Sequence, residues 1–225
     1  MASWLDLEFA GHDLVLDAAL ALYWPARDTL VVSDLHLEKS TFLAQFGSPI
    51  APLDSHDTLA RLAGLVGKYR PKSLILLGDS FHDRGAWERL DDRARGQVLE
   101  ICAAVDDCCF VEGNHDRDMS LPDCLCFEDE RLIDGIVFRH EPETGDAPQV
   151  IGHFHPALSL SLQGHRLRGK CFAVNERMLI MPAFGSFTGG LDLRDPVYAA
   201  IGGAFKPYLV YKNTVAAVRF SPADR

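Results

Sequence analysis

The chain has 225 residues, of which 48% are hydrophobic and 24% are charged, a composition typical of a soluble globular domain. A formal net charge of −10 argues against a broad basic surface that would wrap duplex nucleic acid, but it permits a nucleic-acid substrate held locally. No apolar run reaches the ~18 residues needed to cross a bilayer, and Asp6 and Glu8 interrupt any signal-like stretch. We therefore expect a cytoplasmic protein without membrane association, with one domain over residues 1–225.

Apolar segments typical of strands come first in the chain. We predict strands at residues 5–9, 14–16, 19–23 and 29–33. Between Asp54 and Tyr69 the apolar residues recur every three or four positions, which predicts an amphipathic helix that ends before Pro71. A strand, a helix and a strand are then expected at 73–77, 87–103 and 108–111. This alternation favours an α/β fold, and the pattern beyond Cys124 becomes mostly β.

Three of the buried strands run into polar clusters, and the β-rich second half adds histidines. The clusters are Asp34-Leu35-His36, Gly78-Asp79, Gly113-Asn114-His115-Asp116, His140 and Gly152-His153-Phe154-His155. Because side chains at the ends of parallel strands converge on one crevice, we expect them to lie together. A lone carboxylate placed like that of Asp79 can bridge two cations, and such a pair can activate water and hold a phosphoryl oxygen. Carboxylate, amide oxygen and imidazole without thiolate suit Mn²⁺, Fe²⁺ or Zn²⁺ better than Ca²⁺ or Mg²⁺.

The order of these clusters resembles the signature of the calcineurin-like metallophosphoesterases: Asp-x-His, Gly-Asp, Gly-Asn-His-Asp, a lone His and Gly-His-x-His. The resemblance implies an α/β (α+β) fold, a four-layer αββα sandwich of two mixed β-sheets flanked by helices. It implies one metal ion on Asp34, His36, Asp79 and His155, and a second on Asp79, Asn114, His140 and His153. It also implies that His115 faces the substrate as a general acid and that Asp116 orients it.

A narrower resemblance rests on further segments around the same clusters and near the end of the chain. They are Asp34-Leu35-His36-Leu37-Glu38-Lys39, Gly78-Asp79-Ser80-Phe81-His82-Asp83, Phe138-Arg139-His140-Glu141-Pro142, Met181-Pro182-Ala183-Phe184-Gly185 and Thr188-Gly189-Gly190. These segments resemble the bacterial ligase-associated DNA-repair phosphodiesterases. The resemblance implies a phosphodiesterase with two divalent ions, Mn²⁺ first and Fe²⁺, Zn²⁺ or Ni²⁺ as alternatives. Its implied substrate is single-stranded DNA, cut internally in DNA repair alongside a DNA ligase, an Lhr-type helicase and a nuclease.

Other interpretations stay open. A hydrolase of small nucleotides or phosphomonoesters would use the same chemistry, and a non-catalytic scaffold would use none. His82 and Arg84 closely follow Asp79 and are candidate contacts to a substrate phosphate, with arginine as the better forked donor; the alternative for each is an ordinary loop residue. Phe184 and Phe187 could stack on a base or pack in the core.

Overall fold

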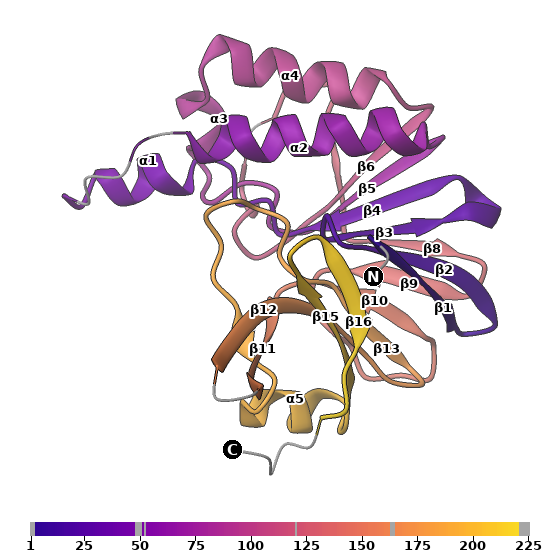
Figure 1. Ribbon diagram of the computed structural model, residues 1–225. Helices are drawn as coiled ribbons and strands as arrows, with labels where there is room; N and C mark the ends of the chain where they lie inside the picture. Colours follow the sequence, from indigo (N-terminus) through magenta and orange to yellow (C-terminus); the bar gives the residue numbers. More distant parts are fainter. Residues whose placement is uncertain (1–2, 48–50, 52, 120, 163–164, 221–225) are drawn as a thin grey trace.

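Two β-sheets lie face to face, with helices on their outer sides (Figure 1). The computed structural model describes residues 3–47, 51, 53–119, 121–162 and 165–220. Helices α2 (Asp54–Tyr69) and α4 (Asp92–Ala103) pack on the first sheet, and α5 (Pro196–Ile201) packs on the second. The layers are therefore helix, sheet, sheet and helix, and the predicted αββα sandwich is confirmed.

The first sheet begins as an antiparallel meander and continues as a parallel sheet. Within the described residues its strands, in spatial order, are β1 (Trp4–Phe9), β2 (His12–Asp17), β3 (Ala21–Trp24), β4 (Thr29–Ser33), β5 (Ser73–Leu77), β6 (Asp107–Val111) and β7 (Phe127–Glu128). A short 3₁₀ helix, Pro25–Arg27, joins β3 to β4. The strands from β4 to β7 run parallel to one another, so their carboxyl ends meet at one edge.

The second sheet is also mixed. Its strands are β8 (Glu130–Ile133), β9 (Ile136–Arg139), β10 (Gln149–Ile151), β11 (Pro156–Leu162), β12 (His165–Val174), β13 (Met178–Ile180), β14 (Leu191–Asp192), β15 (Lys206–Tyr211) and β16 (Thr214–Ala217). β10 is parallel to both β9 and β13. Most other neighbours, such as β8 with β9 and β12 with β15, are antiparallel.

Apolar side chains form a core between each pair of layers. Val31 and Ile75 of the first sheet pack with Phe138 and Phe172 of the second sheet in the central core. The outer cores join α2 and α4 to the first sheet and α5 to the second. Burial on both faces explains why β4, β5 and β6 read as unbroken apolar runs in the sequence.

Helix α2 has the predicted bounds, and it ends where Arg70 adopts a left-handed conformation with its amide bonded to the carbonyl of Val66 at 2.8 Å. The helix predicted at 87–103 is instead divided into α3 (Ala86–Arg89) and α4. The cause is Asp91, whose carboxylate accepts a hydrogen bond from the amide of Ala94 at 2.8 Å and caps a new helix. The short helices α1 (Lys39–Ala44) and α5 were not predicted.

None of the described helices is long and apolar enough to cross a membrane.

The central core can be tested at Phe138, whose ring is fully buried between the sheets. Phe138→Ala should lower the free energy of unfolding by ~3–5 kcal/mol, because the truncation leaves a cavity. The control is Leu132→Ala on the adjacent strand β8, where the side chain is 64% exposed and the expected change is below ~0.5 kcal/mol. Urea denaturation followed by tryptophan fluorescence measures both; equal losses would contradict the buried position of Phe138.

Candidate metal centre

The carboxyl ends of β4, β5 and β6 bring three of the predicted clusters to one edge of the first sheet. Asp34 follows β4 directly, Asp79 lies two residues beyond β5, and Asn114 lies three residues beyond β6. The loops are joined by backbone hydrogen bonds, because the amide of His36 donates to the carbonyl of Asp79 at 2.9 Å. The parallel strands thus place carboxylate and amide oxygens side by side.

The second sheet delivers imidazoles to the same edge. β9 ends just before His140, and the parallel strand β10 ends just before the segment that holds His153 and His155. The sheets are linked here, because the amide of His153 donates to Oδ1 of Asp34 at 3.2 Å. All of the predicted metal ligands therefore lie in two adjacent groups.

The first group consists of Asp34, His36 and His155. Nε2 of His155 lies 2.9 Å from Oδ1 of Asp34 and 3.3 Å from Nε2 of His36. Oδ2 of Asp79 lies 3.8 Å from Nε2 of His36. Three side chains thus surround one point, and the carboxylate of Asp79 borders it.

The second group consists of Asp79, Asn114, His140 and His153. Nε2 of His140 lies 3.3 Å from Oδ2 of Asp79 and 3.2 Å from Oδ1 of Asn114. Nδ1 of His153 lies 3.0 Å from the same amide oxygen. The same carboxylate oxygen of Asp79 therefore faces both groups.

These spacings fit divalent cations. Imidazole nitrogens and carboxylate oxygens bind such ions at ~2.0–2.2 Å, so neighbouring ligand atoms of one ion lie about 3.0–3.6 Å apart. The contacts of His155 in the first group and of His140 in the second group are 2.9–3.3 Å long. These contacts match the spacing of ligands around two ions, and the oxygen of Asp79, 3.8 Å from Nε2 of His36, borders the first group.

The protonation states of the groups also suit metal binding. Burial lowers the pKa of His36 to about 3, so its imidazole is neutral at pH 7, which is the form that binds a metal ion. Burial raises the pKa of Asp34, but the nearby His155, His140 and His36 outweigh it and hold the pKa well below its usual range. Burial lowers the pKa of His140, whereas Asp79 and Asp34 raise it to about 9, so a cation that binds there must displace a proton.

The backbone of these loops is strained. Five of the predicted ligands have positive φ angles: Asp34 at 55°, His36 at 47°, Asp79 at 47°, His153 at 68° and His155 at 47°. Residues other than glycine rarely adopt this conformation, which costs of order 1–3 kcal/mol at each position. Strain of this kind persists where the surrounding structure imposes it, and it gathers at functional sites.

Two glycines allow the loops to approach closely. A Cβ atom on Gly113 would lie 2.1 Å from the backbone nitrogen of Asp79, and a Cβ on Gly78 would lie 2.0 Å from Nδ1 of His140. Both distances are far below contact, and Gly78 also has a φ of +74°. The glycines that precede Asp79 and Asn114 are therefore required by the packing of the ligands themselves.

The predicted orientation of the His115 ring by Asp116 does not rest on a hydrogen bond between the two side chains in the described part of the chain. Its buried carboxylate accepts hydrogen bonds from the amides of Phe81, Gly113 and Ser80 at 2.9, 3.0 and 3.1 Å. Nδ1 of His115 instead lies 2.7 Å from the carbonyl oxygen of His82. Asp116 therefore ties the loops after β5 and β6 together, and it positions His115 through the backbone.

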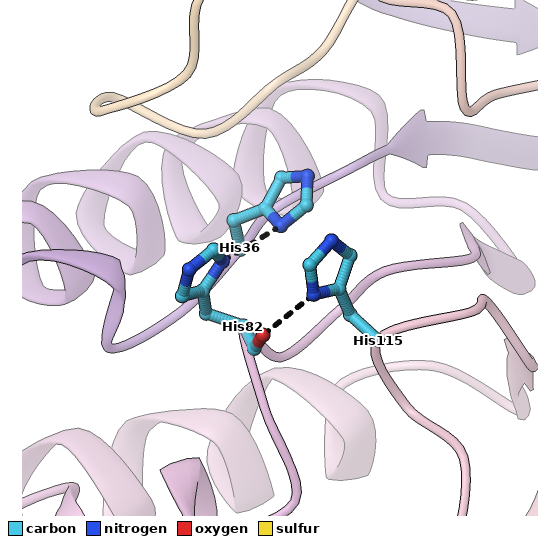
Figure 2. A group of neighbouring side chains, drawn as sticks. All are labelled: His36, His82 and His115. Atoms are coloured by element: carbon cyan, nitrogen blue, oxygen red, sulfur yellow. Dashed lines mark hydrogen bonds between the residues drawn. The ribbon is translucent and has the colours of Figure 1, made fainter. Parts of the chain in front are cut away.

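Of the two candidate phosphate contacts, His82 lies in the histidine cluster at the centre. Figure 2 shows its ring beside those of His36 and His115, with Nδ1 of His82 3.4 Å from Nδ1 of His36. The rings of His82 and His115 are stacked with centroids 5.0 Å apart. Arg84 is exposed, and no hydrogen bond or ion pair within the described residues involves it.

The segment after β13 supports the centre in a way that sequence reasoning missed. The amide of Phe184 donates to the carbonyl of Ser33, and Oγ of Ser33 lies 2.5 Å from Oδ2 of Asp34. Lys170 donates to the carbonyl of Ala183 and thereby holds this segment. Phe184 is fully buried in a core, as one of its two interpretations predicted, whereas Phe187 is 41% exposed.

Residues 28–177 match the calcineurin-like phosphoesterase family. The solved structure of the nuclease MPE from Pseudomonas putida has a TM-score of 0.72 and 29% sequence identity, and the match covers 96% of this chain and 100% of that chain. The phosphoesterase YfcE from E. coli has a TM-score of 0.43 and 14% identity over 84% of this chain and 97% of its own. No curated protein gives a significant match.

The close approach at Gly113 can be tested by adding one methyl group. Gly113→Ala should displace Asp79 and weaken metal binding at least tenfold, because the new Cβ would overlap the Asp79 backbone. The matched control is Gly96→Ala in α4, where a Cβ meets nothing within 4 Å and alanine should stabilise the helix by ~0.5–1 kcal/mol. Metal titration by calorimetry and thermal melting measure the two effects. Equal metal affinity in both variants would contradict the packing described here.

Proposed function

Because the chain belongs to the calcineurin-like phosphoesterases, a family of metal-dependent hydrolases, we propose that it is a binuclear phosphodiesterase that cuts single-stranded DNA internally. The observation that carries the proposal is the single carboxylate oxygen of Asp79 that faces two groups of metal-ligating side chains. The similarity to the Pseudomonas putida nuclease, which extends over nearly the whole of both chains, supports a nucleic-acid phosphodiester as the substrate.

Each residue of the site has a part in this proposal. Two divalent cations bound by the two groups would activate a water molecule and offset negative charge on the phosphoryl group. The carbonyl oxygen of His82 can only accept a hydrogen bond, so Nδ1 of His115 carries a proton. Nε2 of His115 is then the atom that exchanges a proton with the substrate, and a protonated ring can donate it to the leaving oxygen. We also propose that His82, which stacks on His115, contacts a phosphate oxygen.

The ions and the cellular setting are part of the same proposal. We propose Mn²⁺ as the native ion, as the resemblance to the ligase-associated phosphodiesterases implies. The ligands combine imidazole with oxygen donors and contain no thiolate, a set that also suits other divalent transition metals. Fe²⁺, Zn²⁺ and Ni²⁺ are the alternatives. We further propose a cytoplasmic role in bacterial DNA repair, in functional association with a DNA ligase, an Lhr-type helicase and a nuclease.

The substrate can be tested with three compounds and four metal ions. Metal-free protein is reloaded with Mn²⁺, Zn²⁺, Ni²⁺ or Mg²⁺ and given circular single-stranded DNA, bis-p-nitrophenyl phosphate and p-nitrophenyl phosphate. The expected outcome is conversion of circles to linear strands and turnover of the diester well above the monoester, with Mn²⁺ most active. Preferred turnover of the monoester with intact circles would instead indicate a phosphomonoesterase. Failure with every substrate and ion would revive a non-catalytic scaffold.

The roles of Asp79 and His115 can be separated by measuring bound metal and rate in the same preparations. Asp79→Ala should lose metal and all metal-dependent hydrolysis, because the oxygen shared by both groups is removed. His115→Ala should keep its metal and lose about 10²–10⁴-fold in kcat, because only proton transfer is affected. Elemental analysis after dialysis and turnover of the diester give the two readouts. Near wild-type turnover in Asp79→Ala, or metal loss in His115→Ala, would refute the corresponding role.

A further inference from the structure

Helix α1 begins directly after the first metal-ligating segment and carries three side chains at helical spacing. They are Lys39, Phe42 and Phe46, at positions i, i+3 and i+7, which lie on one face of a helix. The helical turn continues beyond Ala44, because the amide of Phe46 donates to the carbonyl of Leu43 at 3.0 Å. Figure 1 shows α1 projecting at the edge of the molecule, beyond the end of α2.

The rings of this face continue the histidine cluster of the metal centre. His115 packs against His36 with centroids 5.1 Å apart and stacks on His82 at 5.0 Å, as the three rings of Figure 2 show. The ring of Phe42 lies 4.9 Å from that of His82, and Phe46 lies 5.3 Å from Phe42. A continuous series of ring contacts thus leads from a metal-ligating side chain to the outer end of α1.

Phe42 and Phe46 do not serve the hydrophobic core. Neither belongs to any of the three buried clusters formed by the described residues. Phe46 is 73% exposed, more than the other described aromatic side chains that reach the surface, such as Trp4 at 47%. Exposing an apolar ring of this size is unfavourable in water. Within the described part of the chain, packing in the hydrophobic core therefore does not account for the position of Phe46.

Lys39 adds a cation at the inner end of this face. Burial lowers the pKa of its ammonium group, and the carboxylates of Asp79 and Asp34 act in the opposite direction. Among the described residues no hydrogen bond or ion pair is made by the Lys39 side chain. A half-buried ammonium beside the metal centre is suited to a phosphate of a strand whose bases lie further out.

We propose that Lys39, Phe42 and Phe46 form a binding track for single-stranded nucleic acid, in which the lysine holds a phosphate and the phenylalanines stack on unpaired bases. The proposal rests on the phosphodiesterase function proposed above and adds the place where the strand lies. Unpaired bases offer their faces to aromatic rings, whereas paired bases in a duplex are stacked on one another. Stacking itself needs no broad basic surface, so the track is compatible with a net charge of −10.

The experiment compares two oligonucleotides of equal length, oligothymidylate and one in which the bases flanking the cleaved site are replaced by abasic residues. Phe46→Ala should lower kcat/KM on oligothymidylate by about 5- to 100-fold, the range expected for the loss of one stacked base. On the abasic strand Phe46→Ala and wild type should agree within about twofold. The readout is the kcat/KM on oligothymidylate divided by the kcat/KM on the abasic strand, because a merely structural role of Phe46 would lower both values equally.

Two further variants complete the test. Phe46→Leu keeps an apolar side chain without a ring, and it should lose nearly as much as Phe46→Ala; full activity in Phe46→Leu would overturn the stacking role. The control is Tyr211→Ala, an aromatic side chain on β15 that is 39% exposed, and its ratio should equal that of wild type. If wild type and Phe46→Ala cut oligothymidylate equally well, the binding track is refuted while the proposed DNA substrate stands. If wild type hydrolyses only the small diester, the proposed DNA substrate and the track fail together.

Discussion

The carboxylate of Asp79 is the contact on which the centre depends. One oxygen accepts a hydrogen bond from the amide of His115 at 2.9 Å, and the other lies 3.3 Å from His140 and 3.8 Å from His36. This residue therefore joins the loop after β6, the second sheet and the segment after β4. The left-handed backbone of Asp79 and the absence of side chains at Gly78 and Gly113 all serve to bring one carboxylate into that position.

The strain at this centre is sustained by the packing of the two sheets. Five ligands in the left-handed region together cost several kcal/mol, and buried carboxylates and imidazoles add the cost of desolvation. Buried residues such as Val31, Ile75 and Phe138 pack in one core and anchor β4, β5 and β9, the strands that lead into these loops. The loops adopt unfavourable conformations because the strands leave them no alternative. Strands that are anchored in the core thus position the ligands, and such support reduces the ordering that ion binding must impose.

Much of this arrangement follows from local features of the sequence. The unbroken apolar runs that became β4, β5 and β6 predict buried parallel strands, and polar residues at their ends predict a shared site. The parts that sequence reasoning missed depend on distant contacts. The carboxylate of Asp116 bonds to amides in the loop after β5, over thirty residues earlier in the chain. Asp91 can either continue a helix or cap one, and here its carboxylate accepts the hydrogen bond of the Ala94 amide as a cap. Helix α1 has only six residues, too few to establish a hydrophobic period.

The origin of the ligands in both sheets has a consequence for the folding of the whole chain. Asp34, Asp79 and Asn114 follow strands of one sheet, whereas His140, His153 and His155 follow strands of the other. An ion bound between them acts as a cross-link between the two halves of the sandwich, and it is lost when they separate. Binding of the cation and association of the two sheets would then be coupled, so the melting temperature of the protein would rise with the concentration of free cation. A cell depleted of the cation would hold less of this protein in its native state as well as less of its activity.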